Sequence, residues 1–216
     1  MPDPHAAARK RRLALIDVDG TLTRVPSIWQ FLMERMNCWW GAGEHNLARF
    51  QAGEVTYEEF CALDAKLLAG TGYHRLERVA AEVPLRPGID DLFVGLRVRG
   101  YRIALISTGL HVLNAQLARR FDVDLSVAND LAADDRICTG EVIIDVHESG
   151  KGEHGRHAIE QFAAEHVLAI GDSVGDLPLF ALADVSVTIS PRTGDIARSA
   201  DYCVDGEDLG TICGLL

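Results

Sequence analysis

Three short, continuous apolar runs dominate the pattern of hydrophobic positions, and each ends in a small or acidic residue. They cover residues 13–17, 101–107 and 167–172. A continuous apolar run of this length is typical of a strand buried on both faces, as in a parallel sheet. Further strands are predicted at 185–189 and 201–204, and helices at 88–100, 110–121, 151–166, 176–184 and 194–200. The alternation predicts an α/β fold with a doubly wound, Rossmann-like parallel sheet.

One long segment near the N-terminus interrupts this alternation. No strand pattern occurs between residues 22 and 87, and helices are predicted there over 27–36 and 57–70. The stretch PLRPG at 84–88 has the composition of a hinge that returns the chain to the core. The segment is therefore predicted to be a helical insertion that follows the first strand.

This insertion defines the predicted domain organisation. We expect a small helical cap domain at 23–85 and an α/β core domain formed by 1–22 and 86–216. An insertion at this point would lie over the carboxyl ends of the strands, where open α/β sheets bind their ligands.

Polar residues stand where the three predicted strands end. Asp17 and Asp19 close the first apolar run, Ser107 ends the second, and Asp172 ends the third. Because the carboxyl ends of neighbouring parallel strands meet at one edge of a sheet, we expect these four side chains to converge on one crevice. The simpler alternative is that each residue caps its own loop, since Asp and Ser are common in turns.

The acidic residues of this set predict a metal site. Asp17, Asp19 and Asp172 bring three carboxylates together, and Asp176 follows closely in the chain. Several buried carboxylates need a cation, and a site built only from oxygen ligands suits Mg²⁺.

Neighbouring residues supply groups that bind anions. The Ser107 hydroxyl and the backbone N–H groups of 107–109 can hold anionic oxygens, and Lys151 adds a positive charge at the start of a predicted helix. Carboxylates, a hard cation, a lysine and backbone amides together favour phosphoryl transfer. A P-loop is excluded, because the Gly and the Ser or Thr that it requires around the lysine are replaced by Asp145 and Gly152.

Composition and charge exclude several other classes. A net charge of −11 argues against sequence-independent nucleic-acid binding, and no run approaches the roughly 20 apolar residues of a membrane helix. The N-terminal 1–12 is predicted to be a frayed tail with a basic end, since the apolar run after it is too short for a signal peptide. Five scattered cysteines without a CxxC pair favour a reducing compartment, so we expect a cytoplasmic protein.

Four motifs, in this order, resemble those of the haloacid-dehalogenase-like (HAD) phosphohydrolases. They are DVDGT at 17–21, ST at 107–108, Lys151 and GDSVGD at 171–176. The sequences AND at 128–130 and TGEV at 139–142, together with the helical insertion, resemble the phosphoserine phosphatase-like branch. The resemblance implies a Mg²⁺-dependent phosphatase that hydrolyses a small-molecule phosphomonoester through an aspartyl-phosphate intermediate.

The resemblance also implies roles for the acidic residues. Asp17 would be the nucleophile, and Asp19 would protonate the leaving alcohol and then deprotonate the attacking water. Mg²⁺ would be bound by the Asp17 side chain, the Asp19 backbone carbonyl and Asp172. Asp176 would lie behind the metal ligands and orient metal-bound waters or Lys151.

A second group is implied to bind the transferring phosphoryl group. It consists of the Ser107 hydroxyl, the Thr108 amide and Lys151, with Gly109 as the next residue of the same backbone segment.

The substrate is predicted from two positions in the cap. In phosphoserine phosphatases a cap glutamate binds the amine of the substrate and a cap arginine binds its carboxylate. Here the glutamate position is Pro26 and the arginine position falls at Asp64. We therefore hypothesise a substrate that bears a cation, such as an amino-sugar or aminocyclitol phosphate, and keep phosphoserine as the alternative. The more ordinary interpretation, that Asp64 faces solvent on its helix, stays open.

Aromatic residues concentrate in the cap, where they favour a small apolar core of its own. Trp29 follows the segment that enters the site and is predicted to contact substrate, as is Tyr57. The sequence CWW at 38–40 would mark a dimer face if it proves exposed, so a homodimer is left open.

Two other functions fit part of the pattern. A phosphotransferase or phosphomutase of the same fold would pass the phosphoryl group to an acceptor other than water. A receiver-like phospho-acceptor domain also combines acids, a hydroxyl, a lysine and Mg²⁺, but it is far shorter and has no second acid two residues after the phosphorylated Asp. Asp19 therefore argues against the receiver.

Overall fold

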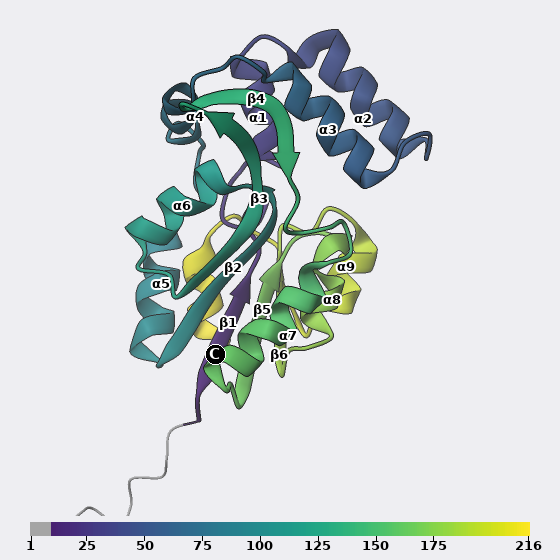
Figure 1. Cartoon of the computed structure of the whole chain (residues 1–216). Coiled ribbons are helices and arrows are strands. Elements are labelled where there is room, and N and C mark those ends of the chain that lie inside the picture. The colour runs from purple at the N-terminus through teal and green to yellow at the C-terminus, as the bar shows by residue number, and fades with distance from the viewer. Residues whose placement is uncertain (1–9) are drawn as a thin grey trace, which may run out of the picture.

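The computed structural model describes residues 10–216 and contains one seven-stranded sheet in the order β4-β3-β2-β1-β5-β6-β7 (Figure 1). The strands are β1 (Arg12–Ile16), β2 (Tyr101–Leu110), β3 (Leu125–Asp134), β4 (Ile137–Ile143), β5 (His166–Gly171), β6 (Val185–Ile189) and β7 (Tyr202–Val204). All neighbouring strands pair in parallel except β3 and β4, which are antiparallel. The predicted α/β fold with a doubly wound parallel sheet is confirmed.

The central strand β1 shows why this core forms. Its residues Leu13, Ala14, Leu15 and Ile16 are all 0% exposed. Successive side chains of a strand point to opposite faces, so Leu13 and Leu15 pack in one apolar cluster, and Ala14 and Ile16 pack in the other. A strand covered on both faces must be apolar at every position, and this is the pattern that the sequence shows.

Two groups of helices cover the sheet. One face carries α5 (Ile89–Val98) and α6 (His111–Arg120), and the other carries α7 (Lys151–Phe162), α8 (Leu177–Phe180) and α9 (Gly194–Ser199) (Figure 1). A 3₁₀ turn, η3 (Leu209–Gly214), packs against α5. Helix α7 ends earlier than predicted because Ala163 adopts a left-handed conformation with φ 46°. The helix predicted at 176–184 is instead a 3₁₀ turn, η2 (Val174–Asp176), followed by the short α8.

The predicted insertion is helical. It contains α1 (Ile28–Arg35), an irregular turn η1 (Trp39–Gly43), α2 (Glu44–Gln51), α3 (Tyr57–Leu67) and α4 (Tyr73–Ala80). α1 and α3 coincide with the predicted helices, whereas α2 and α4 go beyond the prediction. Ser27 caps α1, and Thr56 with Glu59 forms a capping box at the start of α3, which explains where these two helices begin. The exact boundaries of the two domains stay a prediction.

The two ends of the insertion are held together. Thr23 and Leu85 form an antiparallel bridge, and the N–H of Arg24 donates to the Pro84 carbonyl at 2.8 Å. The N–H of Arg86 donates to the Leu22 carbonyl at 2.9 Å. The chain therefore leaves the core and returns to it at neighbouring points.

The β3–β4 hairpin is absent from the sequence prediction. Its two turn residues, Asp135 and Arg136, have φ of 43° and 62°, the left-handed values of a two-residue hairpin turn that usually selects Asn and Gly. The hairpin extends from the sheet to the insertion, where β4 packs against α3 and Ile137 bridges to Gly72 (Figure 1). Part of the core domain thus supports the insertion directly.

The tryptophans proposed as a dimer face differ in exposure. Trp39 is 6% exposed and belongs to the core, whereas Trp40 is 67% exposed. A lone exposed tryptophan does not define an interface, and the homodimer stays a prediction.

Most of the predicted N-terminal tail, residues 1–9, lies outside the described residues. Arg12, at the end of the tail, already belongs to β1. Among residues 10–216, none of the helices has the length and apolar character that crossing a membrane requires.

Candidate active site

The strand register brings the predicted site residues to one edge of the sheet. Ile16 of β1 is level with Leu105 of β2 and Ile170 of β5. The next residue, Asp17, donates its N–H to the Ile170 carbonyl at 3.0 Å, so the acids that end β1 and β5 lie side by side. The structure brings the residues predicted at the strand ends to one edge of the sheet. Asp17 and Asp172 share a hydrogen-bond network through Thr21, Lys151 and Asp176, whereas Ser107 accepts a local bond from the Gly109 N–H.

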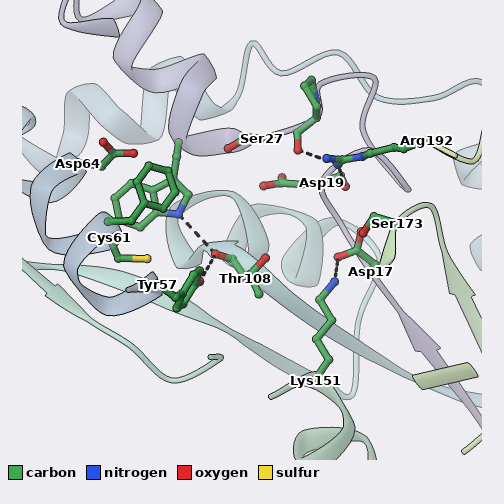
Figure 2. Close-up of a pocket in the computed structure, with 13 residues that line it drawn as sticks. Asp17, Asp19, Ser27, Tyr57, Cys61, Asp64, Thr108, Lys151, Ser173 and Arg192 are labelled. Carbon is green, nitrogen blue, oxygen red and sulfur yellow. Dashed lines mark hydrogen bonds and ion pairs between the residues drawn. The ribbon is translucent and has the colours of Figure 1, made fainter. Parts of the chain in front are cut away.

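Lys151 is the buried centre of this network. It is 3% exposed, and its Nζ donates to Asp17 Oδ1 at 2.5 Å and to Asp176 Oδ1 at 2.7 Å. Burial alone would lower the pKa of Lys151, but the two carboxylates outweigh burial and raise it. Burial and the nearby Asp176 raise the pKa of Asp17 well above its usual value, although Lys151 opposes them. Figure 2 shows the Lys151 ammonium pointing at the Asp17 carboxylate.

Asp17, Asp172 and Asp176 form the acidic cluster that could hold a cation. One carboxylate oxygen of each lies within 4.8 Å of the others, and all three residues are buried. The Thr21 hydroxyl lies 2.9 Å from Asp17 Oδ2 and 3.1 Å from Asp172 Oδ1, which fixes the distance between these two acids.

Asp176 is already satisfied by protein donors. Its Oδ1 accepts from Lys151, and its Oδ2 accepts from the N–H groups of Asp172 and Ser173 at 3.0 Å each. These bonds place Asp176 against Lys151 and the loop after β5. Orienting Lys151 is one of the two roles that the sequence analysis predicts for Asp176, and its role stays a prediction.

Arg192 is a site residue that the sequence analysis missed. Its Nε donates to Asp172 Oδ2 at 2.6 Å, and its Nη2 donates to the carbonyls of Pro26 at 2.9 Å and Asp19 at 3.3 Å. It follows β6, so the reasoning that selected residues after the other strands could have found it.

The charges of the site fit a divalent cation. The cluster of Asp17, Asp172 and Asp176, together with the partly buried Asp19, faces two cationic side chains, Lys151 and Arg192. Four carboxylates against two cations leave an excess of negative charge in a region of low dielectric, which is unfavourable unless a cation joins it. The donor set contains only oxygen, as Mg²⁺ prefers.

Asp19 has a free carboxylate oxygen at the site. Its Oδ2 accepts from the N–H of Ile28 at 2.9 Å, whereas its buried Oδ1 has no hydrogen-bond partner among the residues described. Burial raises the pKa of Asp19 to about 6, although the bond from Ile28 and the charge of Lys151 lower it. A carboxyl group of this kind can exchange a proton with a bound ligand near neutral pH.

The segment Ser107–Gly109 lies beside these acids. Ser107 is 1% exposed, and its Oγ accepts from the Gly109 N–H at 2.9 Å, which leaves its O–H available to donate. A Cβ at Gly109 would lie 2.6 Å from Asp19 Oδ2, so glycine lets the backbone at 109 come close to the Asp19 carboxylate. Thr108 lines the cavity that Asp17 and Asp19 face.

Three side chains hold the Thr108 carbonyl and join the insertion to the core. The Thr108 carbonyl accepts from Asn129 Nδ2 at 3.1 Å and from Trp29 Nε1 and the Tyr57 hydroxyl at 3.4 Å each. Asn129 is 0% exposed and also donates to the Tyr57 oxygen at 2.9 Å. The sequence analysis placed Asn129 only within a family motif and gave it no function.

The acids and the insertion enclose one cavity of about 160 Å³ (Figure 2). Its lining includes all three predicted cap residues, Trp29, Tyr57 and Asp64. Asp64 is 1% exposed, so the alternative in which it faces solvent is wrong. It lies on the same side of α3 as the buried residues Cys61 and Ala65, which carries it inward.

Asp64 is expected to destabilise the fold. Burial raises its pKa from 3.8 to about 6, against the bond from Asn46. The folded chain therefore holds a proton more tightly than the unfolded chain, and the unfavourable contribution is present above pH 6 and fades as the pH falls toward 4. Asp64→Asn should raise the free energy of unfolding at pH 7.5 by on the order of 2 to 3 kcal/mol.

Urea unfolding at pH 7.5 and pH 4 measures this difference. Glu58→Gln, on the exposed side of the same helix, is the matched control, because it removes an exposed ion pair with His147 and should leave the free energy of unfolding close to that of the wild type. An Asp64→Asn chain that is no more stable than the wild type at pH 7.5 would contradict the expected burial cost.

The comparisons with known proteins decide the family. The family model described as haloacid dehalogenase-like hydrolase matches residues 14–181. The chain belongs to this family. Within the haloacid dehalogenase-like hydrolases, its curated relatives carry the name phosphoserine phosphatase, so both the predicted family and the predicted branch are confirmed.

Two relatives illustrate the similarity. The phosphoserine phosphatase of Methanocaldococcus jannaschii is 25% identical over 212 residues, which cover 94% of this chain and 97% of that protein. The phosphoserine phosphatase of Archaeoglobus fulgidus is 25% identical over 215 residues, which cover 96% of this chain but only 60% of that protein. The chain thus spans less than two thirds of some of its haloacid dehalogenase-like relatives.

A solved structure supports the fold. The structure described as a substrate-bound phosphoserine phosphatase complex superimposes with a TM-score of 0.83 at 21% identity, covering 96% of this chain and 99% of that chain. At this identity the likeness speaks for the haloacid dehalogenase-like fold alone.

Proposed function

We propose that the chain is a Mg²⁺-dependent phosphatase that hydrolyses a small phosphomonoester through covalent catalysis on Asp17. The observation that carries this proposal is the position of two different acids on one cavity. Asp17 lies against Lys151, and Asp19 presents an oxygen without a partner among residues 10–216. One carboxylate is thus placed to attack, and the other is placed to move a proton.

The reaction proceeds in two displacements. In the first, an Asp17 oxygen attacks phosphorus in line, the bond to the ester oxygen breaks, and protonated Asp19 donates its proton to the leaving alcohol. In the second, Asp19 takes a proton from water, the water oxygen attacks phosphorus, and the acyl phosphate bond breaks to return Asp17 and inorganic phosphate. Lys151 and the Ser107 hydroxyl hold the phosphoryl oxygens during both steps.

The residues that would hold Mg²⁺ are Asp17, Asp172 and the Asp19 carbonyl. When bound, the ion supplies positive charge that offsets the negative charge of the phosphoryl group and of the acids. Arg192 donates to Asp172 Oδ2 and to the Asp19 carbonyl, so it contacts two of these ligands.

The names of the relatives support a phosphomonoester substrate, and among such substrates they favour phosphoserine. They give no support to the amino-sugar phosphates hypothesised from the sequence. The leaving group faces residues of the insertion, which line the cavity.

Metal removal tests the proposal. Purified chain treated with EDTA should lose at least 100-fold of its phosphate release from p-nitrophenyl phosphate, and added Mg²⁺ should restore it. Release measured without any acceptor alcohol separates a phosphatase from a phosphotransferase. Turnover that persists in EDTA, or that requires an acceptor, would overturn the proposal.

A further inference from the structure

The cavity has two chemically different ends. Asp17 and Lys151 lie at the end formed by the core, whereas Asp64 and Cys61 of α3 lie at the opposite end, with Tyr57 between (Figure 2). If the proposed function holds, the phosphoryl group occupies the core end, and the leaving group extends toward Asp64.

Asp64 is a buried carboxylate without a cation. Its Oδ1 accepts from Asn46 Nδ2 at 2.8 Å, and this is its only hydrogen bond within the described part of the chain. None of the ion pairs among residues 10–216 includes it. A buried carboxylate that lacks a cation is costly, and a residue needed only for packing could be neutral. The other oxygen is therefore free for a charge supplied by the ligand.

Aromatic side chains line the same cavity. Trp29, Tyr57 and Phe60 all belong to its lining. The Trp29 Nε1 and the Tyr57 hydroxyl both donate to the Thr108 carbonyl, and the Phe60 ring stacks on Phe50 with centroids 4.8 Å apart. The rings are thus fixed in place. Aromatic rings beside a carboxylate form a site that attracts organic ammonium groups, whether primary or methylated.

A carboxylate on the leaving group would find no unpaired cation in the described lining of the cavity. Among the described residues that line the cavity, Lys151 and Arg192 are the two cations. Both form ion pairs with acids at the end of the cavity formed by the core. A substrate carboxylate placed near Asp64 would meet a like charge in a buried setting.

The size of the cavity limits the leaving group. A volume of about 160 Å³ is small beside the roughly 300 to 1,000 Å³ of typical ligand pockets, and the phosphoryl group takes part of it. A short amino alcohol fits this space better than an amino sugar.

We propose that Asp64 and the aromatic residues of the cavity lining bind an ammonium group on the leaving alcohol, so that the preferred substrate is the phosphate ester of a small amino alcohol without a carboxylate. This inference rests on the proposed function and narrows it. Asp64 acts as the residue that determines specificity, and Asn46 holds its carboxylate in position.

Matched esters test the proposal with the wild-type chain. 2-Aminoethyl phosphate, its N-trimethyl analogue, 2-hydroxyethyl phosphate, O-phosphoserine and glucosamine 6-phosphate differ only in the leaving group. We expect kcat/KM for 2-aminoethyl phosphate or its trimethyl analogue to exceed that for 2-hydroxyethyl phosphate by about 10- to 100-fold, the contribution of one charged hydrogen-bonded pair. The kcat/KM for O-phosphoserine should be lower than that for 2-aminoethyl phosphate, although both esters carry an amine. A higher kcat/KM for O-phosphoserine or for the neutral ester would overturn the proposal.

Variants of α3 assign the preference to Asp64. In Asp64→Asn the ratio of kcat/KM between 2-aminoethyl and 2-hydroxyethyl phosphate should fall to near one, whereas Glu58→Gln should keep the wild-type ratio. A ratio that survives in Asp64→Asn would overturn the role of Asp64.

A binding measurement separates this inference from the proposed function. Calorimetric titration of the Asp17→Asn chain needs no turnover, and we expect it to bind 2-aminoethyl phosphate at least 10-fold more tightly than 2-hydroxyethyl phosphate. Equal affinities would refute the ammonium site even if p-nitrophenyl phosphate is hydrolysed. A clear preference without any hydrolysis by the wild-type chain would refute the phosphatase and keep the ammonium site.

Discussion

Replacing Asp17 by Asn will reduce phosphate release by at least about 1,000-fold and leave the chain folded. An amide oxygen is a poor nucleophile, so the covalent step has no substitute. The fold should survive because Asn has nearly the same shape and Lys151 keeps its bond to Asp176 at 2.7 Å. Steady-state kinetics with p-nitrophenyl phosphate measures the loss, and far-UV circular dichroism checks the fold.

The covalent intermediate gives this prediction a second measurement. Acid quenching of the wild-type chain during turnover should trap a phosphorylated protein that hydroxylamine cleaves, and the Asp17→Asn chain should show none. Asp195→Asn, whose carboxylate is exposed and does not line the cavity, serves as the control and should behave as the wild type. More than a tenth of wild-type activity in Asp17→Asn would exclude Asp17 as the nucleophile.

Replacing Lys151 by Met will remove activity and also destabilise the chain by about 3 to 5 kcal/mol. Lys151 is the cation between two buried acids, and it lies 2.5 Å from Asp17 and 2.7 Å from Asp176. Without it, two like charges remain buried with no cation between them, and the phosphoryl group loses a charged donor. Urea unfolding measures the stability, and the phosphate assay measures the activity.

A double variant distinguishes the two consequences of losing Lys151. Adding Asp176→Asn to Lys151→Met removes one of the unpaired charges, so part of the lost stability should return, while the activity should not. If the free energy of unfolding of the Lys151→Met chain lies within about 1 kcal/mol of the wild-type value, the buried ion pairs do not stabilise the fold.

The core of the fold was predictable because its strands are buried on both faces. Such strands carry apolar residues at every position, and this signal is local in the sequence. β3 lacks it, since Asn129 and Asp130 interrupt its apolar positions and its side chains bond across to other elements. The turn at Asp135 and Arg136 lacks the usual Asn and Gly, so the hairpin had no signal from its turn either.

The site was predictable where it depends on strand ends, and less so where it depends on tertiary contacts. The acids after β1 and β5 follow apolar runs, so their convergence could be inferred from topology. Arg192 also follows a strand, but the bonds that Arg192 and Asn129 make join segments far apart in the chain, and no local pattern reveals these partners. The sequence did contain a signal for the burial of Asp64, since Cys61, Ala65 and Leu68 share its side of the helix and are apolar.

The bridge between Thr23 and Leu85 has a consequence for how such enzymes diversify. Because the chain enters and leaves the insertion at adjacent points, everything between these two residues can be altered or exchanged without moving the ends of the strands on either side. Asp17 precedes the exit point, and Ser107, Lys151 and Asp172 follow the point of return. If the proposed function holds, the residues that break the ester bond and those that select the leaving group are encoded in largely separate parts of the gene, so a descendant can acquire a new substrate while its chemistry stays the same.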